Sequence, residues 1–297
     1  MKILITGGGG FIGAWLARRL VAEGHQLRVF EPVGRSAQFD RIVGVSAAAM
    51  EWRIGDIADA QAVRAAAEGC EAIVHLAGVL TPACKADPVR GAMINLIGTL
   101  NVFNAAQAFG IRRIVFTSSA GVYGPHDGTT PRPITHYGAF KLACEGSARA
   151  YWEDHGIASI GFRPYIVYGF GRETGMTAGP SLACRAAARR ETYVIPYVGT
   201  AGLVLVDDVV AAYEAALRRE PDGALVFNLP GEVASNDEVV AAVRAVVPEA
   251  RIGIDGPVLP FAEDIGEGDL RRVFPDLPAT SLRDGIRRTI ELYRTAS

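Results

Sequence analysis

The sequence predicts an α/β protein: a doubly wound parallel sheet with helices on both faces, together with a smaller C-terminal lobe. Two observations carry this prediction. Short runs of apolar and β-branched residues recur along the chain, and Ala- and Leu-rich segments with helical spacing lie between most of them. Runs without polar alternation are typical of strands buried on both faces, and a strand–helix–strand order gives right-handed crossovers between parallel strands.

The expected elements follow in order along the chain. We expect strands at Lys2–Thr6, Leu27–Glu31, Trp52–Ile54, Ala72–Leu76, Arg113–Thr117, Ala158–Arg163, Leu203–Val206 and Ala224–Asn228. We expect helices at Phe11–Ala22, Ala60–Ala67, Pro88–Phe109 and Tyr137–His155. Gly and Pro become frequent after Pro164, so residues 1–165 are expected to form the main domain and 166–297 mainly the smaller lobe. The strand near 203–206 is expected to rejoin the main sheet.

The composition is that of a globular protein. The chain has 297 residues, of which 49% are hydrophobic and 21% charged, and its net charge is −2. Acidic and basic residues are interleaved, which gives no basic stripe for nucleic acid or an anionic membrane surface. No apolar stretch approaches the roughly 18 residues of a membrane span, and the first apolar run is too short for a signal peptide. The scattered cysteines predict reduced thiols, no metal site and a cytoplasmic location.

A glycine-rich turn follows the first strand. Gly7, Gly10 and Gly13 have the spacing of a dinucleotide-binding loop, and Phe11 and Ile12 open the next helix. In such a loop the first glycine permits a tight turn, the second lets backbone N–H groups approach a diphosphate, and the third allows close helix–strand packing. The alternative is a glycine turn without a ligand. The strand before it, the helix after it and a second strand ending in an acid favour a Rossmann-type site, with these five residues at the cofactor.

The acid that ends the second strand is Glu31. An acid at this position accepts hydrogen bonds from the adenosine ribose hydroxyls and repels a 2′-phosphate, so NAD is the predicted cofactor. Arg35, four residues later, leaves the acceptance of NADP open. The ends of the third and fourth strands are expected to flank the cofactor at Asp56, Ile57, Leu76, Ala77 and Gly78.

A candidate proton-transfer unit lies at the same edge of the predicted sheet. Tyr137 and Lys141 are four residues apart on one face of a helix, and an ammonium group nearby favours the phenolate form of tyrosine. Ser119 follows the strand Arg113–Thr117, at the carboxyl edge where open α/β sheets bind ligands. We expect Ser119 to orient a substrate oxygen, Tyr137 to exchange its proton and Lys141 to tune the phenol. The alternative is a chance Tyr/Lys pair on a surface helix.

At these motifs the chain resembles the extended short-chain dehydrogenase/reductases, specifically the NAD-dependent epimerase/dehydratase family. The resemblance covers roughly residues 1–215 and is carried by TGGGGFIG (6–13), GDI (55–57), HLAG (75–78), NLIGTLN (95–101), FTSSAGVYG (116–124), YGAFK (137–141), FRPYIVYG (162–169) and VDDVV (206–210). It implies that Ser119 is the catalytic serine, that Ser118 is structural and that Asn95 supports the helix beside the cofactor. It also implies cofactor contacts at Thr117, Tyr137, Lys141, Pro164 and Val167, and a homodimer built from the helices at about 88–109 and 137–155.

The chain departs from relatives that act on nucleotide-diphosphate sugars. The resemblance places Ile166 where those members usually carry an Asn, and Ala201 and Gly202 where they carry an Arg. A further Arg is expected near 259–261, where this chain has Leu-Pro-Phe. Each lost charge-assisted contact to a pyrophosphate costs roughly 1.5–3 kcal/mol, which argues against a nucleotide-sugar substrate. The cations that could substitute are Arg172, Arg185 and Arg251.

Substrate contacts are expected beyond the catalytic strand and in the Gly-rich loop Gly169–Pro180. The candidates are Thr81, Ser119, Tyr123, His126, His136, Tyr165 and Arg172. Arg172 could bind a carboxylate or simply pair with the adjacent Glu173. The loop could close over substrate as a lid or serve only as a connection.

The leading hypothesis is an NAD-dependent oxidoreductase that transfers hydride at a secondary hydroxyl or ketone of a small polar substrate, such as a sugar, sugar acid or polyol. An NAD-dependent sugar epimerase is the alternative, because its first half-reaction is the same. Dehydration ranks third, since Ala120 and Gly121 stand where a dehydratase would carry an acidic pair. A hypothesis of another class is a catalytically silent NAD-binding sensor, which the presence of both Tyr137 and Lys141 disfavours.

Overall fold

The computed structural model describes residues 1–125 and 127–295. Within them, seven strands form a parallel sheet in the order β10-β6-β5-β4-β1-β2-β3. These strands are β1 (Lys2–Thr6), β2 (Gln26–Glu31), β3 (Glu51–Ile54), β4 (Ala72–His75), β5 (Arg113–Thr117), β6 (Ser159–Pro164) and β10 (Ala224–Leu229). The chain winds in opposite directions from β1, which confirms the doubly wound, Rossmann-type fold and leaves a crevice at the carboxyl ends of β1 and β4.

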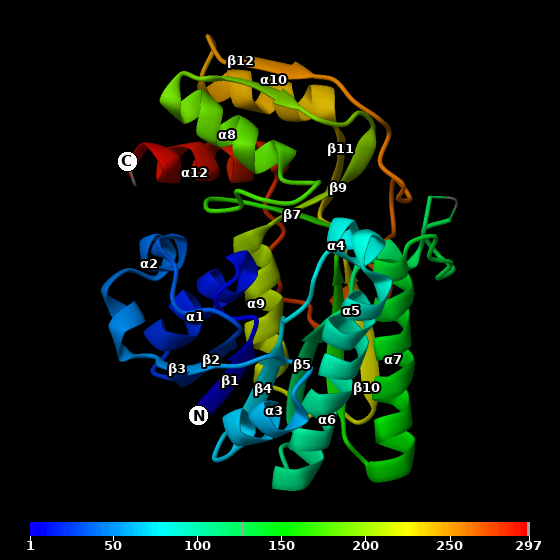
Figure 1. Cartoon of the computed structure of the whole chain (residues 1–297). Coiled ribbons are helices and arrows are strands. Elements are labelled where there is room, and N and C mark those ends of the chain that lie inside the picture. The colour runs from blue at the N-terminus through cyan, green and yellow to red at the C-terminus, as the bar shows by residue number, and fades with distance from the viewer. Residues whose placement is uncertain (126, 296–297) are drawn as a thin grey trace.

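Helices cover both faces of this sheet (Figure 1). One face carries α1 (Phe11–Ala22), α2 (Ala37–Val43) and α9 (Val206–Leu217), and the other carries α3 (Ala60–Ala67), α6 (Gly98–Phe109) and α7 (His136–His155). The residues of β1 alternate between the two cores: Ile3 and Ile5 pack with α1 and α9, and Leu4 packs with α3 and α6. All three are fully buried, which explains why the strand shows no polar alternation.

A smaller lobe sits at the carboxyl edge of the sheet, at the top of Figure 1. Its strands are β7 (Ile166–Tyr168), β8 (Thr192–Ile195), β9 (Thr200–Leu205), β11 (Glu232–Ser235) and β12 (Arg251–Ile254). Its longer helices are α8 (Gly179–Arg189), α10 (Asn236–Val246) and α12 (Leu282–Thr295). Side chains from these helices join the core on the α1 and α9 face of the main sheet, so hydrophobic packing is continuous from sheet to lobe.

One topological prediction was wrong. The strand expected near 203–206 does not rejoin the main sheet, because β9 pairs in parallel with β7 and antiparallel with β11. The position beside β6 belongs instead to β10, which pairs with β6 from Ala224↔Ser159 to Leu229↔Pro164. The chain therefore leaves the main sheet where β6 ends and returns to it through α9 and β10.

The helix expected at Pro88–Phe109 consists of α5 (Pro88–Ala92), a π-helical segment η2 (Met93–Ile97) and α6. The Asn95 side chain donates to the carbonyl of Gly91 at 3.0 Å and to that of Val79 at 3.1 Å. Such side-chain bonds accompany a local widening of the helix, and π-helical turns are frequent at functional sites. The remaining short elements are α4 (Thr81–Ala86), α11 (Leu270–Val273) and the 3₁₀ turns η1 (Gly44–Ala49) and η3 (Ala120–Val122).

Among the described residues, no helix is long and apolar enough to cross a membrane. The thiols in this part of the chain are free and buried, at Cys70, Cys84, Cys144 and Cys184.

Candidate active site

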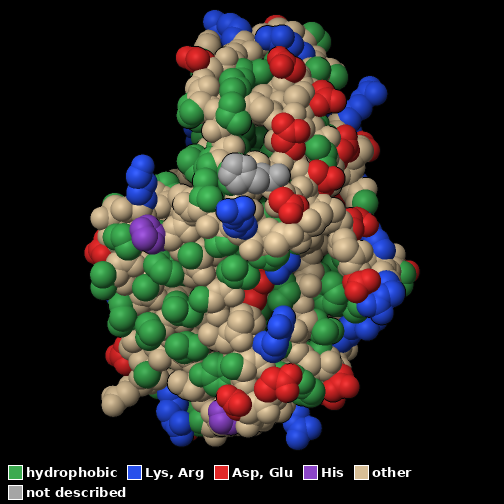
Figure 2. Space-filling model, turned by 90° about the vertical axis from the view of Figure 1, so that its right-hand side faces the viewer, with side chains coloured by type: hydrophobic (Ala, Val, Ile, Leu, Met, Phe, Trp, Pro, Cys, Tyr) green, Lys and Arg blue, Asp and Glu red, His purple; other side chains and the backbone are tan. Residues whose placement is uncertain are grey.

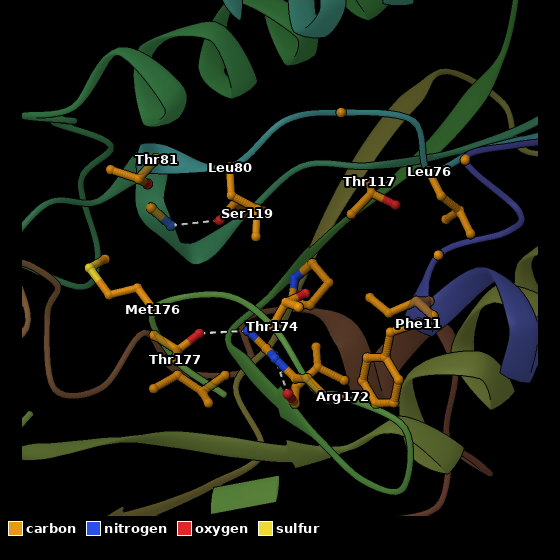
Figure 3. Close-up of a pocket in the computed structure, with 18 of the residues that line it drawn as sticks. Phe11, Leu76, Leu80, Thr81, Thr117, Ser119, Arg172, Thr174, Met176 and Thr177 are labelled. Carbon is orange, nitrogen blue, oxygen red and sulfur yellow. Dashed lines mark hydrogen bonds between the residues drawn. The ribbon is translucent and has the colours of Figure 1, made fainter. Parts of the chain in front are cut away.

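A cavity of about 480 Å³ opens between the carboxyl edge of the main sheet and the smaller lobe (Figure 3). Residues from both halves of the chain line it. The predicted residues that it brings together are Gly7, Gly10, Phe11, Ile12, Gly13, Leu76, Gly78, Thr81, Thr117, Ser119, Tyr137, Pro164, Tyr165, Val167 and Arg172. Cavities that hold small ligands are about 300–1,000 Å³, so its size fits a binding site.

The glycine turn at one end of the cavity is defined by backbone contacts. Gly7 has a φ of +71°, and a Cβ there would lie 2.4 Å from the Ala77 backbone nitrogen. A Cβ on Gly13 would lie 2.5 Å from the Gly8 Cα atom. Helix α1 begins at Phe11 and is capped by Gly10, which has no side chain to bond to the first N–H groups. Those N–H groups and the helix dipole are therefore available to an anion such as a diphosphate.

Glu31 lies next to this turn at the end of β2. Its Oε1 atom accepts a hydrogen bond from the Gly9 N–H at 2.7 Å. Burial raises the pKa of the Glu31 carboxyl, and backbone hydrogen bonds from the glycine turn oppose that shift. Arg35, which left NADP binding open, forms an ion pair with Asp40 at 2.9 Å.

Besides Glu31, five predicted cofactor residues lie outside the cavity lining, namely Lys141, which is described below, and four others. Asp56 accepts from the Ala58 N–H at 2.9 Å and pairs with Arg90 at 2.5 Å, which lower the pKa of its carboxyl. The neighbouring Ile57 is buried. Ala77 packs against Gly7 as described above. Asn95 is fully buried, and its Oδ1 atom has no hydrogen-bond partner within the described residues.

The candidate proton-transfer residues converge at the start of α7. Thr135 caps this helix by accepting from the Gly138 N–H at 3.1 Å, which places Tyr137 in the first turn and Lys141 one turn later. Lys141 is only 3% exposed. Its Nζ atom donates to the Thr117 carbonyl at 2.8 Å and lies 5.8 Å from the centre of the Tyr137 ring.

Ser119 faces the same point from the loop after β5. Its Oγ atom accepts from the Gly121 N–H at 3.0 Å (Figure 3). A Cβ on Gly121 would lie 3.3 Å from Ser119 Oγ and 3.7 Å from Tyr137 Cδ1, so both side chains flank this glycine. Ser118 is buried and donates to the Glu145 carboxylate, in agreement with the structural role that the resemblance implied.

Two predicted substrate residues point elsewhere. Tyr123 is 3% exposed, and its hydroxyl donates to Asn228 Oδ1 at 2.9 Å and accepts from Arg163, because the turn η3 directs the ring into the protein. His136 is exposed at the first position of α7 and stacks on Phe140, with ring centres 6.1 Å apart. Neither is among the described residues that line the cavity. His126 lies outside the described residues.

The cavity also contains residues that the sequence did not single out, some from the smaller lobe and some from the main domain. Phe261 lines the cavity and packs edge-on against Tyr165, with ring centres 6.5 Å apart. Gln38 comes from the start of α2, and its side chain donates to the Gly171 carbonyl. The remaining additions include Leu80, Glu173, Thr174, Met176 and Thr177. The Gly-rich composition of 169–180 signalled that loop, whereas no local pattern marks Phe261.

Arg172 lies in that loop with its guanidinium at the cavity wall (Figure 3). It donates to the Val167 carbonyl and, at 2.6 Å, to the Thr177 hydroxyl. The expected alternative, a pair with Glu173, is not formed. Glu173 instead pairs with Arg41 at 3.4 Å and with Arg185 at 3.9 Å.

The chain is similar to proteins of a known family. A family model described as the NAD dependent epimerase/dehydratase family matches residues 3–229. The chain belongs to this family. The family is NAD-dependent by description, which agrees with NAD as the predicted cofactor and with an enzymatic role.

Individual family relatives differ in substrate. A UDP-glucose 4-epimerase from Mycolicibacterium smegmatis is 30% identical over 100% of both chains. A 2-alkyl-3-oxoalkanoate reductase from Stenotrophomonas maltophilia is 32% identical, over 85% of this chain and 77% of its own. A crystal structure of Thermus thermophilus UDP-glucose 4-epimerase in complex with NAD matches with a TM-score of 0.85 and 23% identity, over 100% of both chains. This last likeness shows the shared fold.

Proposed function

We propose that this family member is an NAD-dependent oxidoreductase that interconverts a secondary alcohol and a ketone on a small polar substrate. The observation that carries the proposal is that Ser119 and Tyr137 line the same cavity as the glycine turn, with the Nζ atom of buried Lys141 5.8 Å from the centre of the Tyr137 ring. Proton-transfer groups and a dinucleotide cradle in one cleft are the parts that hydride transfer needs.

The glycine turn fits a dinucleotide. Side chains at Gly7 and Gly13 would collide with neighbouring backbone, and the open N-terminus of α1 offers N–H donors for the diphosphate. Glu31, already oriented by Gly9, would accept the adenosine ribose hydroxyls. When bound, NAD supplies the hydride acceptor for the substrate carbon.

The protein residues then handle the proton and the substrate oxygen. Ser119 would donate to that oxygen and hold it near Tyr137. Tyr137 would take the hydroxyl proton as the hydride leaves the adjacent carbon, and would return it in the reverse direction. Lys141, buried and fixed by the Thr117 carbonyl, would place its positive charge beside the phenol and favour the phenolate.

The substrate side of the cavity supports a small substrate rather than a nucleotide sugar. Ile166 is buried in β7. A Cβ at Gly202 would lie 2.2 Å from the Pro230 carbonyl oxygen and 2.6 Å from Tyr165 Cδ1, so a longer side chain has no room there. Phe261 adds an apolar wall. The pyrophosphate of a nucleotide sugar would therefore find few cationic side chains on the substrate side of the cavity. A small polar molecule does not need them.

An epimerase remains the second candidate, because the M. smegmatis relative with that name spans the whole chain. The two candidates differ in whether reduced cofactor accumulates. Purified protein incubated with NAD and a panel of sugars, sugar acids and polyols should raise the absorbance of reduced nicotinamide with at least one member. Conversion of UDP-glucose to UDP-galactose without net reduction of NAD would instead show an epimerase, and NAD binding without turnover of either kind would show a sensor.

We further propose that the enzyme is located in the cytoplasm, where buried thiols stay reduced.

We also propose a homodimer built on α6 and α7. Hydrophobic side chains gather over the lower half of the face in Figure 2, which is the right-hand side of Figure 1, where α6 and α7 lie. Exposed apolar side chains on the 88–109 segment include Val89, Met93 and Phe109. Light scattering after size exclusion should give twice the chain mass, and the mass of one chain would contradict the dimer.

A further inference from the structure

Arg172 is the cation that the proposed reaction does not use. It sits between two glycines with positive φ, Gly171 at +92° and Gly175 at +99°, in the loop that joins β7 to α8. The backbone turns there in a way that favours glycine, and the Arg172 side chain is directed to the cavity wall rather than to solvent (Figure 3).

The guanidinium has only neutral partners. Its two acceptors among the described residues are the Val167 carbonyl and the Thr177 hydroxyl. Within residues 1–125 and 127–295, no carboxylate forms an ion pair with it, and the adjacent Glu173 is engaged by Arg41 and Arg185. A guanidinium has five N–H donors, so three of them have no partner in the described part of the chain.

Arg172 is partly buried, and withdrawing part of its charge from water without an anion is costly. Burial lowers the pKa of Arg172 to about 10, and the nearby Tyr197 and Tyr137 partly oppose that shift. Arg172 and Tyr137 line the same cavity. Buried arginines are ordinarily paired with a carboxylate or phosphate.

The one carboxylate among the described lining residues, Glu173, is paired with Arg41 and Arg185, and the other polar side chains of this wall are neutral. Thr81, Thr174 and Thr177 contribute hydroxyls, and among the described residues that line the cavity Arg172 is the one Lys or Arg. A single planar guanidinium matches one carboxylate, which it can bind with two parallel hydrogen bonds. A phosphate or pyrophosphate carries more charge and would call for further cations.

We propose that Arg172 is the receptor for a carboxylate on the substrate, so that the enzyme acts on a small hydroxy acid or its keto form. The turnover of the acid by hydride transfer rests on the proposed function. The binding of the acid to Arg172 does not. The carboxylate binds the Arg172 guanidinium, which the Thr177 hydroxyl holds in place. The reacting carbon then lies near Ser119 and Tyr137.

The test uses substrate analogues that share one scaffold. D-glucuronate, D-glucose and D-glucose 6-phosphate differ at C6, and threonate and threitol form a second acid–neutral pair. For each compound, kcat/KM with NAD and the binding constant on the NAD-loaded protein by calorimetry should be measured. We expect at least one acid to be favoured over its neutral partner by about 10- to 100-fold, the factor that a charge-assisted contact supplies.

Variants then assign the preference to Arg172. Arg172→Met should remove the preference for the acid and leave the neutral partner within about threefold. Arg172→Lys should retain part of the preference for the acid, because lysine keeps the positive charge but lacks the two parallel N–H donors of a guanidinium. Arg189→Met is the matched control, since Arg189 is exposed on α8 of the same lobe, and it should behave as wild type. Thermal unfolding and NAD affinity show whether each variant is folded.

The outcomes separate the two proposals. Acid binding that depends on Arg172 without turnover of any compound supports the receptor and contradicts the oxidoreductase. Turnover in which Arg172→Met weakens acid and neutral compounds equally contradicts the receptor and leaves the oxidoreductase standing. A stronger preference for D-glucose 6-phosphate that Arg172→Met abolishes overturns the carboxylate in favour of a phosphate. Failure of every acid to bind the loaded protein also overturns the receptor.

Discussion

The two ends of the cavity are built in different ways. The cofactor end is defined by backbone, because a Cβ at Gly7 would lie 2.4 Å from the Ala77 nitrogen after β4 and a Cβ at Gly13 would lie 2.5 Å from the Gly8 Cα atom. The substrate end is defined by side chains from separate segments, among them Thr81 in α4, Arg172 in the loop before α8 and Phe261 in the C-terminal third. A backbone-defined site tolerates little substitution, whereas a side-chain-defined site can change specificity without changing the fold.

The cofactor end is also braced from below by a buried polar chain. Thr6 Oγ1 and His75 Nδ1 are 2.6 Å apart, and His75 Nε2 and Thr99 Oγ1 are 2.9 Å apart. Thr99 donates onward to the Asn95 carbonyl at 2.7 Å, so it accepts from His75, which fixes the neutral Nε2–H tautomer. This chain of hydrogen bonds connects β1 and β4 to the π-helical segment.

The largest expected effect lies at the cofactor end. Gly13→Ala puts a Cβ 2.5 Å from the Gly8 Cα atom, so the turn must move and NAD affinity should fall more than tenfold, with a loss of about 1–3 kcal/mol in the free energy of unfolding. Gly34→Ala is the matched control, because a Cβ at Gly34 meets nothing within 4 Å among the described residues. Calorimetric titration with NAD measures both. Equal NAD affinities of the Gly13→Ala and Gly34→Ala variants would show that the close backbone contact at Gly13 does not shape the cofactor site.

The second effect concerns stability and pH. Burial and the charge of Lys141 lower the pKa of His75 to about 3, from an unfolded value of 6.5. The unfolded state therefore binds the proton first, so the contribution of neutral His75 is complete above pH 6.5 and is lost as the pH falls toward 3, at up to about 1.4 kcal/mol per pH unit. Urea unfolding from pH 8 to pH 4.5 should show a steeper loss in wild type than in His75→Gln. The exposed His136→Gln should keep the wild-type slope.

The third effect is cofactor choice. Glu31→Gln removes the negative charge but keeps the shape, so the ratio of NADP to NAD affinity should rise about tenfold. Burial raises the pKa of Glu31, so the same relaxation should begin in wild type as the pH falls and the carboxyl is protonated. Glu68→Gln, at an exposed position after α3, is the control. An unchanged ratio in Glu31→Gln would remove this residue from cofactor recognition.

The smallest effect belongs to the substrate end. Glu173→Gln breaks half-exposed ion pairs to Arg41 and Arg185, each worth about 0–1 kcal/mol. The free energy of unfolding should change by less than about 1 kcal/mol, and NAD affinity should stay within twofold. A change in NAD affinity as large as that of Gly13→Ala would show that the two ends of the cavity are not separable.

The same contrast explains what could be predicted from the sequence. The glycine turn, Glu31, Ser119, Tyr137 and Lys141 lie within short motifs attached to strands with continuous apolar runs, so local spacing was enough to place them on one edge. Tyr123 was placed wrongly, because the motif does not show that η3 turns its ring inward to Asn228 and Arg163.

Long-range packing set the features that the sequence missed. The apolar runs of β9 and β10 look alike, and only tertiary pairing decides that β10 extends the main sheet. Phe261 reaches the cavity from a segment without regular structure, where no periodicity marks a functional residue. Whether Arg172 pairs with Glu173 or faces the cavity depends on the direction of the Glu173 side chain. Adjacency in the sequence does not define that direction.

Proton transfer by Tyr137 is tested by the substitution Tyr137→Phe. The substitution keeps the ring beside Lys141 and removes only the hydroxyl. Single-turnover reduction of NAD should fall by about 10²–10⁴-fold, while the dissociation constant of NAD stays within about threefold of wild type. A rate within tenfold of wild type at unchanged NAD affinity would contradict proton transfer by Tyr137.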